Sequence, residues 1–269
     1  QAEAFGVILK RPDCYPQRTV NTQRLLLGTP AEKRAELTHR LYQAYWVEGL
    51  PVGSREVLKH LAEEVGVDAS CLDDPAIKQG LFDATQVAQD LGMFGVPSVE
   101  VNGKFYWGAD RLQFVARDLG LERVDSPPTP SNPPATIEFF HDFASPFAYL
   151  ASTQMARLAE AHGATLVYKP ILLGALFKEI GTPMVPLFEM NPARQDYLRR
   201  DLLDWAQWWD VPFSFPSTFP IHTVAALRVA LQEPGVTDVL YEAAWSKGLN
   251  IGDPDLLCQV LDEAGFDGK

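Results

Sequence analysis

The sequence predicts an α/β fold in which the closing part of a sheet comes before its opening part. Residues 136–143 and 164–170 are β-forming stretches on either side of a helical pattern over 146–162, as in a βαβ unit. Residues 98–107 contain two short strands around an Asn-Gly pair, typical of a β-hairpin, and a helix is expected over 110–118. These parts make an α/β domain, but here the hairpin precedes the βαβ unit.

Further helices are expected between these parts, so each half of the chain carries a helical insertion. Residues 192–209 have apolar residues at helical spacing on one face. The pattern over 221–265 predicts two or three helices, and a similar pattern recurs over 17–65. Residues 76–92 form one more predicted helix, which leads into the hairpin.

Composition limits the kinds of partner that we expect and the cellular compartment of the protein. The 269 residues carry a net charge of −12, which disfavours a nucleic-acid partner. No apolar run has the length of a membrane span, and residues 1–30 lack the apolar core of a signal peptide. Cys14, Cys71 and Cys258 form no CxxC pair, and the cysteines and histidines lack metal-ligand spacing. We therefore expect a cytoplasmic protein without a metal or a membrane contact.

A proline-rich linker divides the chain near its middle. Residues 125–134 contain five prolines, which predicts an extended, semi-rigid spacer over 125–135. The predicted domains are therefore residues 1–124 and residues 136–269.

Residues recur in register on the two sides of this linker. In the first register, Val7, Pro12, Pro16, Thr19, Val20, Arg24 and Leu27 match Val211, Pro216, Pro220, Thr223, Val224, Arg228 and Leu231. In the second, Leu41, Trp46, Gly49, Gly53 and Gly66 match Leu240, Trp245, Gly248, Gly252 and Gly265. Generic amphipathic helices would not repeat a tryptophan and three glycines at fixed spacing, so a tandem duplication is predicted. Residues 1–124 would be the middle and C-terminal half of one copy, and residues 136–269 the N-terminal half of the next.

Ser145 and Pro146 stand where the first strand of the βαβ unit passes into its helix. Serine followed by proline is a common helix start, with the serine as the N-cap, and this reading needs no function. The functional alternative is that the hydroxyl and the positive helix end stabilise an anion such as a thiolate. The protein would then activate a sulfur atom that the substrate brings.

Val96-Pro97 and Asp110-Arg111 flank the predicted hairpin and also permit two readings. Val96-Pro97 can be an ordinary turn, or a cis peptide that turns the Val96 main chain toward an extended peptide. Asp110 can be an acidic first-turn residue, with Arg111 at the surface, or it can bind an α-amino group.

Three strings taken together closely resemble the family of 2-hydroxychromene-2-carboxylate isomerase and kappa-class glutathione transferase, within the DsbA-like thioredoxin superfamily. They are Asp142-Phe-Ala-Ser-Pro-Phe-Ala-Tyr-Leu150, Phe94-Gly-Val-Pro-Ser98 and Trp107-Gly-Ala-Asp-Arg-Leu112. The similarity also includes Lys169–Phe177 and Asn191–Tyr197. It implies a thioredoxin-like fold with a helical insertion, its halves here in permuted order, and glutathione as the cofactor.

The resemblance also implies roles for single residues. Ser145 would activate the glutathione thiol, and Val96, before Pro97, would bind the glutathione backbone. Asp110 with Ala109 would hold the γ-glutamyl end, and Arg194 would be a basic residue near the cofactor. The apolar side of the site, which would face the substrate, would be lined by Phe147, Lys169 and Trp107. Phe147 would also contact glutathione.

The chain departs from the family pattern in three ways. Ala109 replaces a residue that is usually polar, which removes one expected hydrogen bond to glutathione. An asparagine usual after the second strand is not evident around residues 181–183. Ser145 and the Val96-Pro97 turn belong to different copies.

The predicted function is a glutathione-dependent isomerase that acts by thiol addition and elimination on a small molecule, an intermediate of aromatic degradation. A kappa-type glutathione transferase and an inactive glutathione-binding fragment are the alternatives, and a homodimer is possible. Disulfide exchange is disfavoured because residues 145–148 contain no cysteine. A serine hydrolase built from His141, Asp142 and Ser145 would lack the GxSxG elbow.

Neither half is expected to close a sheet alone, because unpaired central strands are costly. We therefore expect the strand and helix around Ser145 to fold onto the earlier hairpin. This arrangement would give one recombined domain with Ser145 beside Val96-Pro97.

Overall fold

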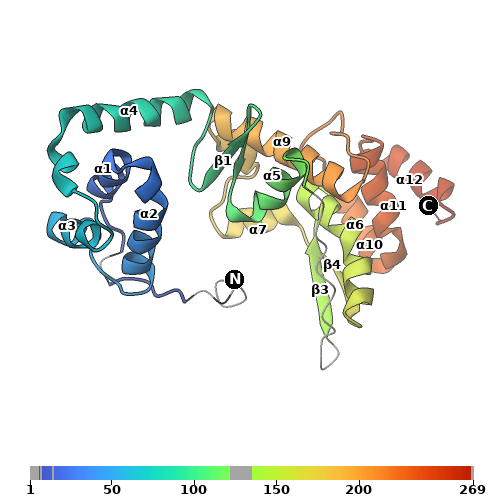
Figure 1. The fold of residues 1–269 in the computed structure, drawn as a ribbon. Helices are drawn as coiled ribbons and strands as arrows, with labels where there is room; N and C mark the ends of the chain where they lie inside the picture. The colour runs from blue at the N-terminus through green and yellow to red at the C-terminus, as the bar shows by residue number, and fades with distance from the viewer. Residues whose placement is uncertain (1–5, 7, 14, 122–134, 268–269) are drawn as a thin grey trace. The chain divides into compact units, whose positions relative to one another are not determined.

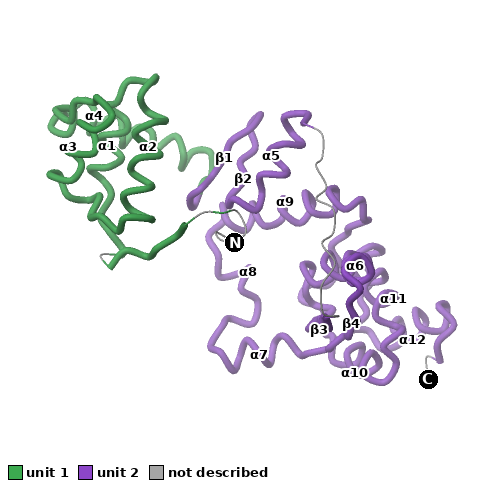
Figure 2. Tube along the Cα trace, turned by 60° about the horizontal axis from the view of Figure 1, so that its bottom comes forward, with its two compact units in different colours: residues 1–93 green, residues 94–269 purple. Residues whose placement is uncertain are grey.

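The computed structural model of the chain describes residues 6, 8–13, 15–121 and 135–267 (Figure 1). The chain divides into two compact units, residues 1–93 and residues 94–269 (Figure 2). The predicted linker lies outside the described residues except for Ala135. The hairpin therefore belongs to the same compact unit as the βαβ segment, although it precedes the linker.

In the described part of the first unit, all regular secondary structure is helical. Its core consists of leucines that the helices present to one another, among them Leu25, Leu37, Leu58 and Leu61, which are fully buried. Asp74 caps the last helix by accepting a hydrogen bond from the Ala76 N–H. The elements are α1 (Val20–Gly28), α2 (Ala31–Trp46), α3 (Arg55–Glu64), the 3₁₀ turn η2 (Ala69–Asp73) and α4 (Pro75–Asp90).

The second unit contains all four described strands, each close to its predicted position. Its first elements are β1 (Ser98–Val101), β2 (Lys104–Trp107), the 3₁₀ turn η3 (Ala109–Arg111), α5 (Leu112–Asp118), β3 (Thr136–His141), α6 (Pro146–Ala161) and β4 (Thr165–Pro170). Then follow α7 (Leu173–Glu179), α8 (Pro186–Glu189), α9 (Pro192–Trp209), α10 (Val224–Gln232), η4 (Pro234–Val236), α11 (Thr237–Tyr241), the π-helical turn η5 (Glu242–Ser246) and α12 (Pro254–Glu263). No described helix of either unit combines the length and apolarity that crossing a bilayer requires.

The predicted hairpin is confirmed. Strands β1 and β2 are antiparallel, and Val101 pairs with Lys104 across the turn. Asn102 and Gly103 both have positive φ, at 51° and 80°, which a two-residue hairpin turn requires and which asparagine and glycine tolerate.

The βαβ unit is also confirmed, with β3 and β4 parallel and Phe139 opposite Tyr168. The main core of the second unit is formed by the turn after β3 and by side chains from α6 and the elements between α9 and α12. Phe143, Tyr241 and Trp245 are fully buried in this core, and the Trp245 indole N–H donates to the Phe143 carbonyl. Most of the unit's buried apolar surface therefore lies among helices rather than between sheets.

The single recombined sheet expected from the sequence is wrong for the described residues. Strands β1–β2 and β3–β4 form two separate two-stranded sheets. The hairpin instead lies beside α5 and α9 (Figure 2). The reason is an aromatic cluster, in which Phe94 and Phe105 pack on Tyr197 of α9 at ring distances of 5.3 and 5.2 Å.

Ion pairs reinforce this contact between α5 and α9. Arg111 donates to both carboxylate oxygens of Asp201, at 2.6 and 2.9 Å, and Arg117 pairs with Asp204 at 2.7 Å. Asp201 is 3% exposed and the Arg111 side chain 16%. The hydrogen-bonded carboxylate raises the pKa of Arg111, so the guanidinium stays charged.

The two segments that repeat in sequence have matching local structure. The Lys10 N–H donates to the Trp46 carbonyl at 2.6 Å, and the Ser214 N–H donates to the Trp245 carbonyl at the same distance. After each tryptophan, a glycine with positive φ follows three residues later, at 75° for Gly49 and 69° for Gly248. The resemblance between the segments therefore extends to their hydrogen bonding.

Replacing Asp201 by asparagine should destabilise the second unit by about 3 kcal/mol, because it leaves the mostly buried Arg111 charge with only the exposed Asp110 carboxylate as a partner. Chemical denaturation followed by tryptophan fluorescence measures this loss. The matched control is Arg55→Ala, which breaks an exposed pair with Asp73 and should cost less than about 1 kcal/mol. Equal losses in both variants would contradict the structural role given to Asp201.

Stability of the second unit should fall between neutral and mildly acid pH because of His141. This side chain is 2% exposed, and burial lowers its pKa to about 4. The unfolded chain, with a histidine pKa of about 6.5, binds more protons than the folded chain between these values. The free energy of unfolding should therefore drop as pH falls from about 6.5 toward 4, by up to ~3 kcal/mol.

The variant His141→Phe removes this titration, so its free energy of unfolding should depend less on pH between 7 and 5 than the wild type. His222→Asn, at an exposed position, is the control and should keep the wild-type slope. A wild-type slope in His141→Phe would show that the histidine is not the source.

Candidate functional site

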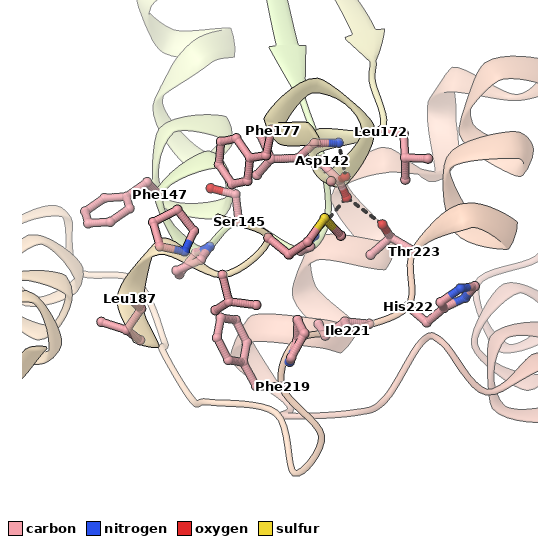
Figure 3. A pocket seen from close by; sticks show the side chains of 18 of the residues that line it. Asp142, Ser145, Phe147, Leu172, Phe177, Leu187, Phe219, Ile221, His222 and Thr223 are labelled. Carbon is pink, nitrogen blue, oxygen red and sulfur yellow. Dashed lines mark hydrogen bonds between the residues drawn. The ribbon is translucent and has the colours of Figure 1, made fainter. Parts of the chain in front are cut away.

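Ser145 lies at the rim of a cavity of about 520 Å³ in the second unit (Figure 3). Three stretches of chain and one helix form its walls: residues 142–147, residues 172–190, residues 215–224 and α9. The lining is predominantly apolar, with Phe147, Leu173, Phe177, Leu187, Phe219 and Ile221 among its side chains. Such a cavity suits a small apolar or aromatic ligand.

Local interactions hold the Ser145 hydroxyl at the start of α6. The turn after β3 closes with a hydrogen bond from the Ser145 N–H to the Asp142 carbonyl, at 3.0 Å. The Ser145 hydroxyl oxygen accepts from the Ala148 N–H at 3.2 Å, which confirms the helix-cap reading. Accepting this bond leaves the hydroxyl proton available to a ligand. A hydrogen-bond donor at the positive end of a helix can stabilise an anion.

Several cavity residues were not identified from the sequence. Arg199 lies on α9, and His222 and Thr223 come from the segment before α10. The wall at 215–224 lies at least 70 residues after Ser145 and belongs to the repeated segment, so nothing local indicated its position. Lys169 was predicted on the apolar substrate side, but it does not line the cavity. Its ammonium group pairs with Glu138 across β3 and β4, at 3.2 Å.

The remaining predicted site residues gather around the hairpin. The Val96–Pro97 peptide is cis, and Val96 is 88% exposed, so its main chain borders solvent. The Gly108 backbone has a φ of 104°, and a Cβ there would lie 2.5 Å from an Asp110 carboxylate oxygen. Glycine at position 108 therefore leaves the space in which the Asp110 carboxylate lies against the turn.

Helix α9 connects this second group of residues to the cavity. The Arg194 guanidinium lies 5.7 Å from the ring centre of Trp107 and also 5.7 Å from that of Phe94. The Tyr197 hydroxyl accepts from the Trp107 N–H at 3.0 Å. Leu198, Arg199 and Leu202 of the same helix line the cavity. One helix thus contributes side chains both to the Ser145 cavity and to the hairpin group.

The structure does not bring all predicted site residues into one cavity. Ser145 and Phe147 line it, whereas Val96, Pro97, Trp107, Ala109, Asp110 and Arg194 are not among the residues described around it. Ser145 beside Val96-Pro97 was the expectation of the recombined domain. The aromatic and ionic contacts that hold the hairpin on α9 account for this difference.

A hydrolytic triad finds no support in the hydrogen bonds of the described residues. His141 Nδ1 lies 3.1 Å from the Tyr241 hydroxyl, inside the core, and its other ring nitrogen has no partner in the structure. Four aromatic rings surround it, with centroids 5.4–5.7 Å from that of the imidazole. His141 is therefore a core residue rather than a base for Ser145.

Relatives with known names share part of the chain. The 2-hydroxychromene-2-carboxylate isomerase of Pseudomonas putida is 29% identical over 135 residues, which are 49% of this chain and 66% of the relative. Glutathione S-transferase kappa 1 of Caenorhabditis elegans is 31% identical over 143 residues, which are 48% of this chain and 62% of the relative. The matched segments thus span less than two thirds of either relative.

A solved structure of 2-hydroxychromene-2-carboxylate isomerase is also similar, at 26% identity, and covers 49% of this chain and 67% of its own. The TM-score of that superposition is 0.39. The model of the DSBA-like thioredoxin domain family matches residues 1–120 and again residues 136–269. With nearly all of its length matched on both sides of the linker, the chain belongs to the DSBA-like thioredoxin domain family.

Proposed function

We propose that the chain is a glutathione-dependent isomerase of the 2-hydroxychromene-2-carboxylate isomerase type, with Ser145 as its catalytic residue. The observation that carries this proposal is a serine hydroxyl at the N-terminus of α6, at the rim of a mainly apolar cavity. The matching relatives carry the names of glutathione transferases and of isomerases.

The residues present fit glutathione in two respects. The Ser145 hydroxyl and the α6 N-terminus suit a thiolate, and the exposed cis Val96–Pro97 turn suits an extended peptide backbone. Asp110 and Ala109 would bind the γ-glutamyl end, and Arg194 would supply a positive charge near a carboxylate. These roles extend the proposal to the hairpin group.

In this mechanism, bound glutathione supplies a thiol that adds reversibly to a conjugated carbon of the substrate. Ser145 donates its hydroxyl proton to the sulfur in a hydrogen bond and lowers the pKa of the thiol. Phe147, Phe177 and Phe219 exclude water and orient a flat, apolar substrate, which suits an aromatic small molecule. The chain's contribution is thus stabilisation of one anion and alignment of two reactants.

A kappa-type glutathione transferase is the second candidate, favoured by the 31% identical relative. Both reactions begin with the same thiolate, so the Ser145 geometry does not separate them. An isomerase returns glutathione unchanged, and a transferase consumes it in proportion to product. Measuring free thiol during turnover therefore decides between the two.

We also propose that residues 1–124 and 136–269 are parts of two tandem copies of one ancestral unit. The paired sequence registers, the equivalent hydrogen bonds at Trp46 and Trp245, and the repeated family match support this. The boundary between the compact units, after residue 93, differs from the boundary between the two proposed copies. The reason is that the hairpin of the first copy packs on α9 of the second. Such recombination would let one chain hold both groups of site residues.

Replacing Ser145 by alanine should reduce glutathione-dependent turnover about 100-fold, because one hydrogen bond to the developing anion is lost. Glutathione affinity, measured by calorimetry, should change little. Thr153→Ala, which removes a hydroxyl elsewhere on α6, is the control and should retain activity. Unchanged turnover in Ser145→Ala would reject the catalytic role. A wild type without binding or turnover would favour an inactive fragment.

Replacing Asp110 by asparagine should weaken glutathione binding about tenfold, since the carboxylate loses its charge toward an α-amino group. Glu160→Gln, an exposed change of the same charge on α6, is the control and should leave affinity unaltered. If both variants bind glutathione as the wild type does, the hairpin group is not the γ-glutamyl site.

A further inference from the structure

Asp142 is a buried carboxylate in the wall of the Ser145 cavity, and it is 2% exposed. One of its oxygens accepts from the Ala144 N–H at 3.0 Å and from the Thr223 hydroxyl at 2.6 Å. The other accepts from the Leu173 N–H at 2.8 Å. Figure 3 shows its bond to Thr223 among the residues that line the cavity. Three donors from three separate segments therefore compensate for burying one charge.

Each donor belongs to a different wall of the cavity. Ala144 lies in the turn that precedes Ser145, Leu173 is the first residue of α7, and Thr223 directly precedes α10. These partners lie 2, 31 and 81 residues from Asp142 in the sequence. A single carboxylate thus joins three of the four walls of the cavity, all except α9.

The main chain of Asp142 adds a direct connection to Ser145. Its carbonyl accepts from the Ser145 N–H at 3.0 Å and from the buried Tyr241 hydroxyl at 3.3 Å. The side chain and main chain of one residue therefore determine where the Ser145 turn lies relative to the walls at 173 and 223.

The charge of Asp142 argues against a direct part in stabilising a thiolate. A second negative charge near an anion raises its energy, so this carboxylate opposes the proposed chemistry electrostatically. Its three hydrogen bonds instead account for its presence. We propose that Asp142 and Thr223 are positioning residues that align the apolar walls of the cavity with the Ser145 hydroxyl; for catalysis, this rests on the proposed function.

The test uses the full-length chain and the variants Thr223→Val, Thr223→Ser and Asp142→Asn. Thr223→Val removes one donor with little change in shape, and Thr223→Ser retains the hydroxyl. Asp142→Asn turns one accepting oxygen into a donor that faces another donor. Thr237→Val is the matched control, because Thr237 is also buried and donates to the Pro234 carbonyl, away from the cavity.

We expect Thr223→Val and Asp142→Asn to lower kcat per folded molecule about tenfold or more, since small displacements of reacting groups are costly. Thr223→Ser should restore kcat to within about twofold of the wild type, as expected if the hydroxyl alone matters. Thr237→Val should lower the melting temperature without changing kcat. If Thr223→Val loses stability but keeps kcat, the positioning role is rejected.

A second measurement keeps this proposal separate from the proposed reaction. The neutral fluorophore Nile red reports binding to an apolar cavity, and Ala175→Trp, which adds a large side chain to the cavity lining, identifies the signal that arises there. Thr223→Val and Asp142→Asn should weaken this binding, whereas Thr223→Ser and Thr237→Val should not. A wild type without glutathione-dependent turnover would reject the proposed function, and the Nile red affinities would still decide whether Asp142 and Thr223 shape the cavity.

Discussion

The arrangement of the second unit depends on the contact between α9 and the hairpin with its following helix α5. The bidentate Arg111–Asp201 pair and the Tyr197–Trp107 hydrogen bond hold these elements together. A bidentate pair of this kind has a defined geometry, so it specifies the position of the hairpin as well as stabilising it. Leu198, Arg199 and Leu202, which neighbour Tyr197 and Asp201 on α9, line the Ser145 cavity. A shift of this helix would therefore change both groups of candidate site residues together.

Helix packing also explains how the unit tolerates two small sheets. A two-stranded sheet is only marginally stable by itself and needs a helix against one face. The hairpin obtains this support from α5 and α9, and the β3–β4 pair obtains it from α6 and the core around Tyr241 and Trp245. Because each sheet already has its partner, joining the two is not required for either to fold. The sequence argument for one sheet considered only strand edges and missed this alternative.

Local sequence signals predicted much of the fold. The incorrect predictions concern contacts between distant residues, for which the sequence contains no local signal. Asn-Gly gave the hairpin at its observed bounds, Ser145-Pro146 gave the start of α6, and apolar residues at helical spacing gave α9. The position of the hairpin on α9 depends on contacts between residues about 90 apart, and no periodicity reports these. Ser145 was predicted as a site residue because it follows a strand, stands at a helix N-cap and lies in a string that resembles a known family. Asp142 was considered only as part of a hydrolytic triad, since its real partners lie 31 and 81 residues away.

The magnitudes indicate which part of the α6 N-terminus matters most for an anion. A helix dipole contributes about 0.3–1 kcal/mol at an exposed end and up to about 2 kcal/mol when partly buried. A hydrogen bond to a charged group contributes about 1.5–3 kcal/mol. The buried Asp142 charge reduces the benefit of the dipole, although its three donors direct their own dipoles toward it. Under the proposed function, the Ser145 hydroxyl would therefore be the largest favourable local effect on a bound thiolate. Because a hydrogen bond depends on direction, the proposed positioning by Asp142 would matter to such a site as much as the hydroxyl itself.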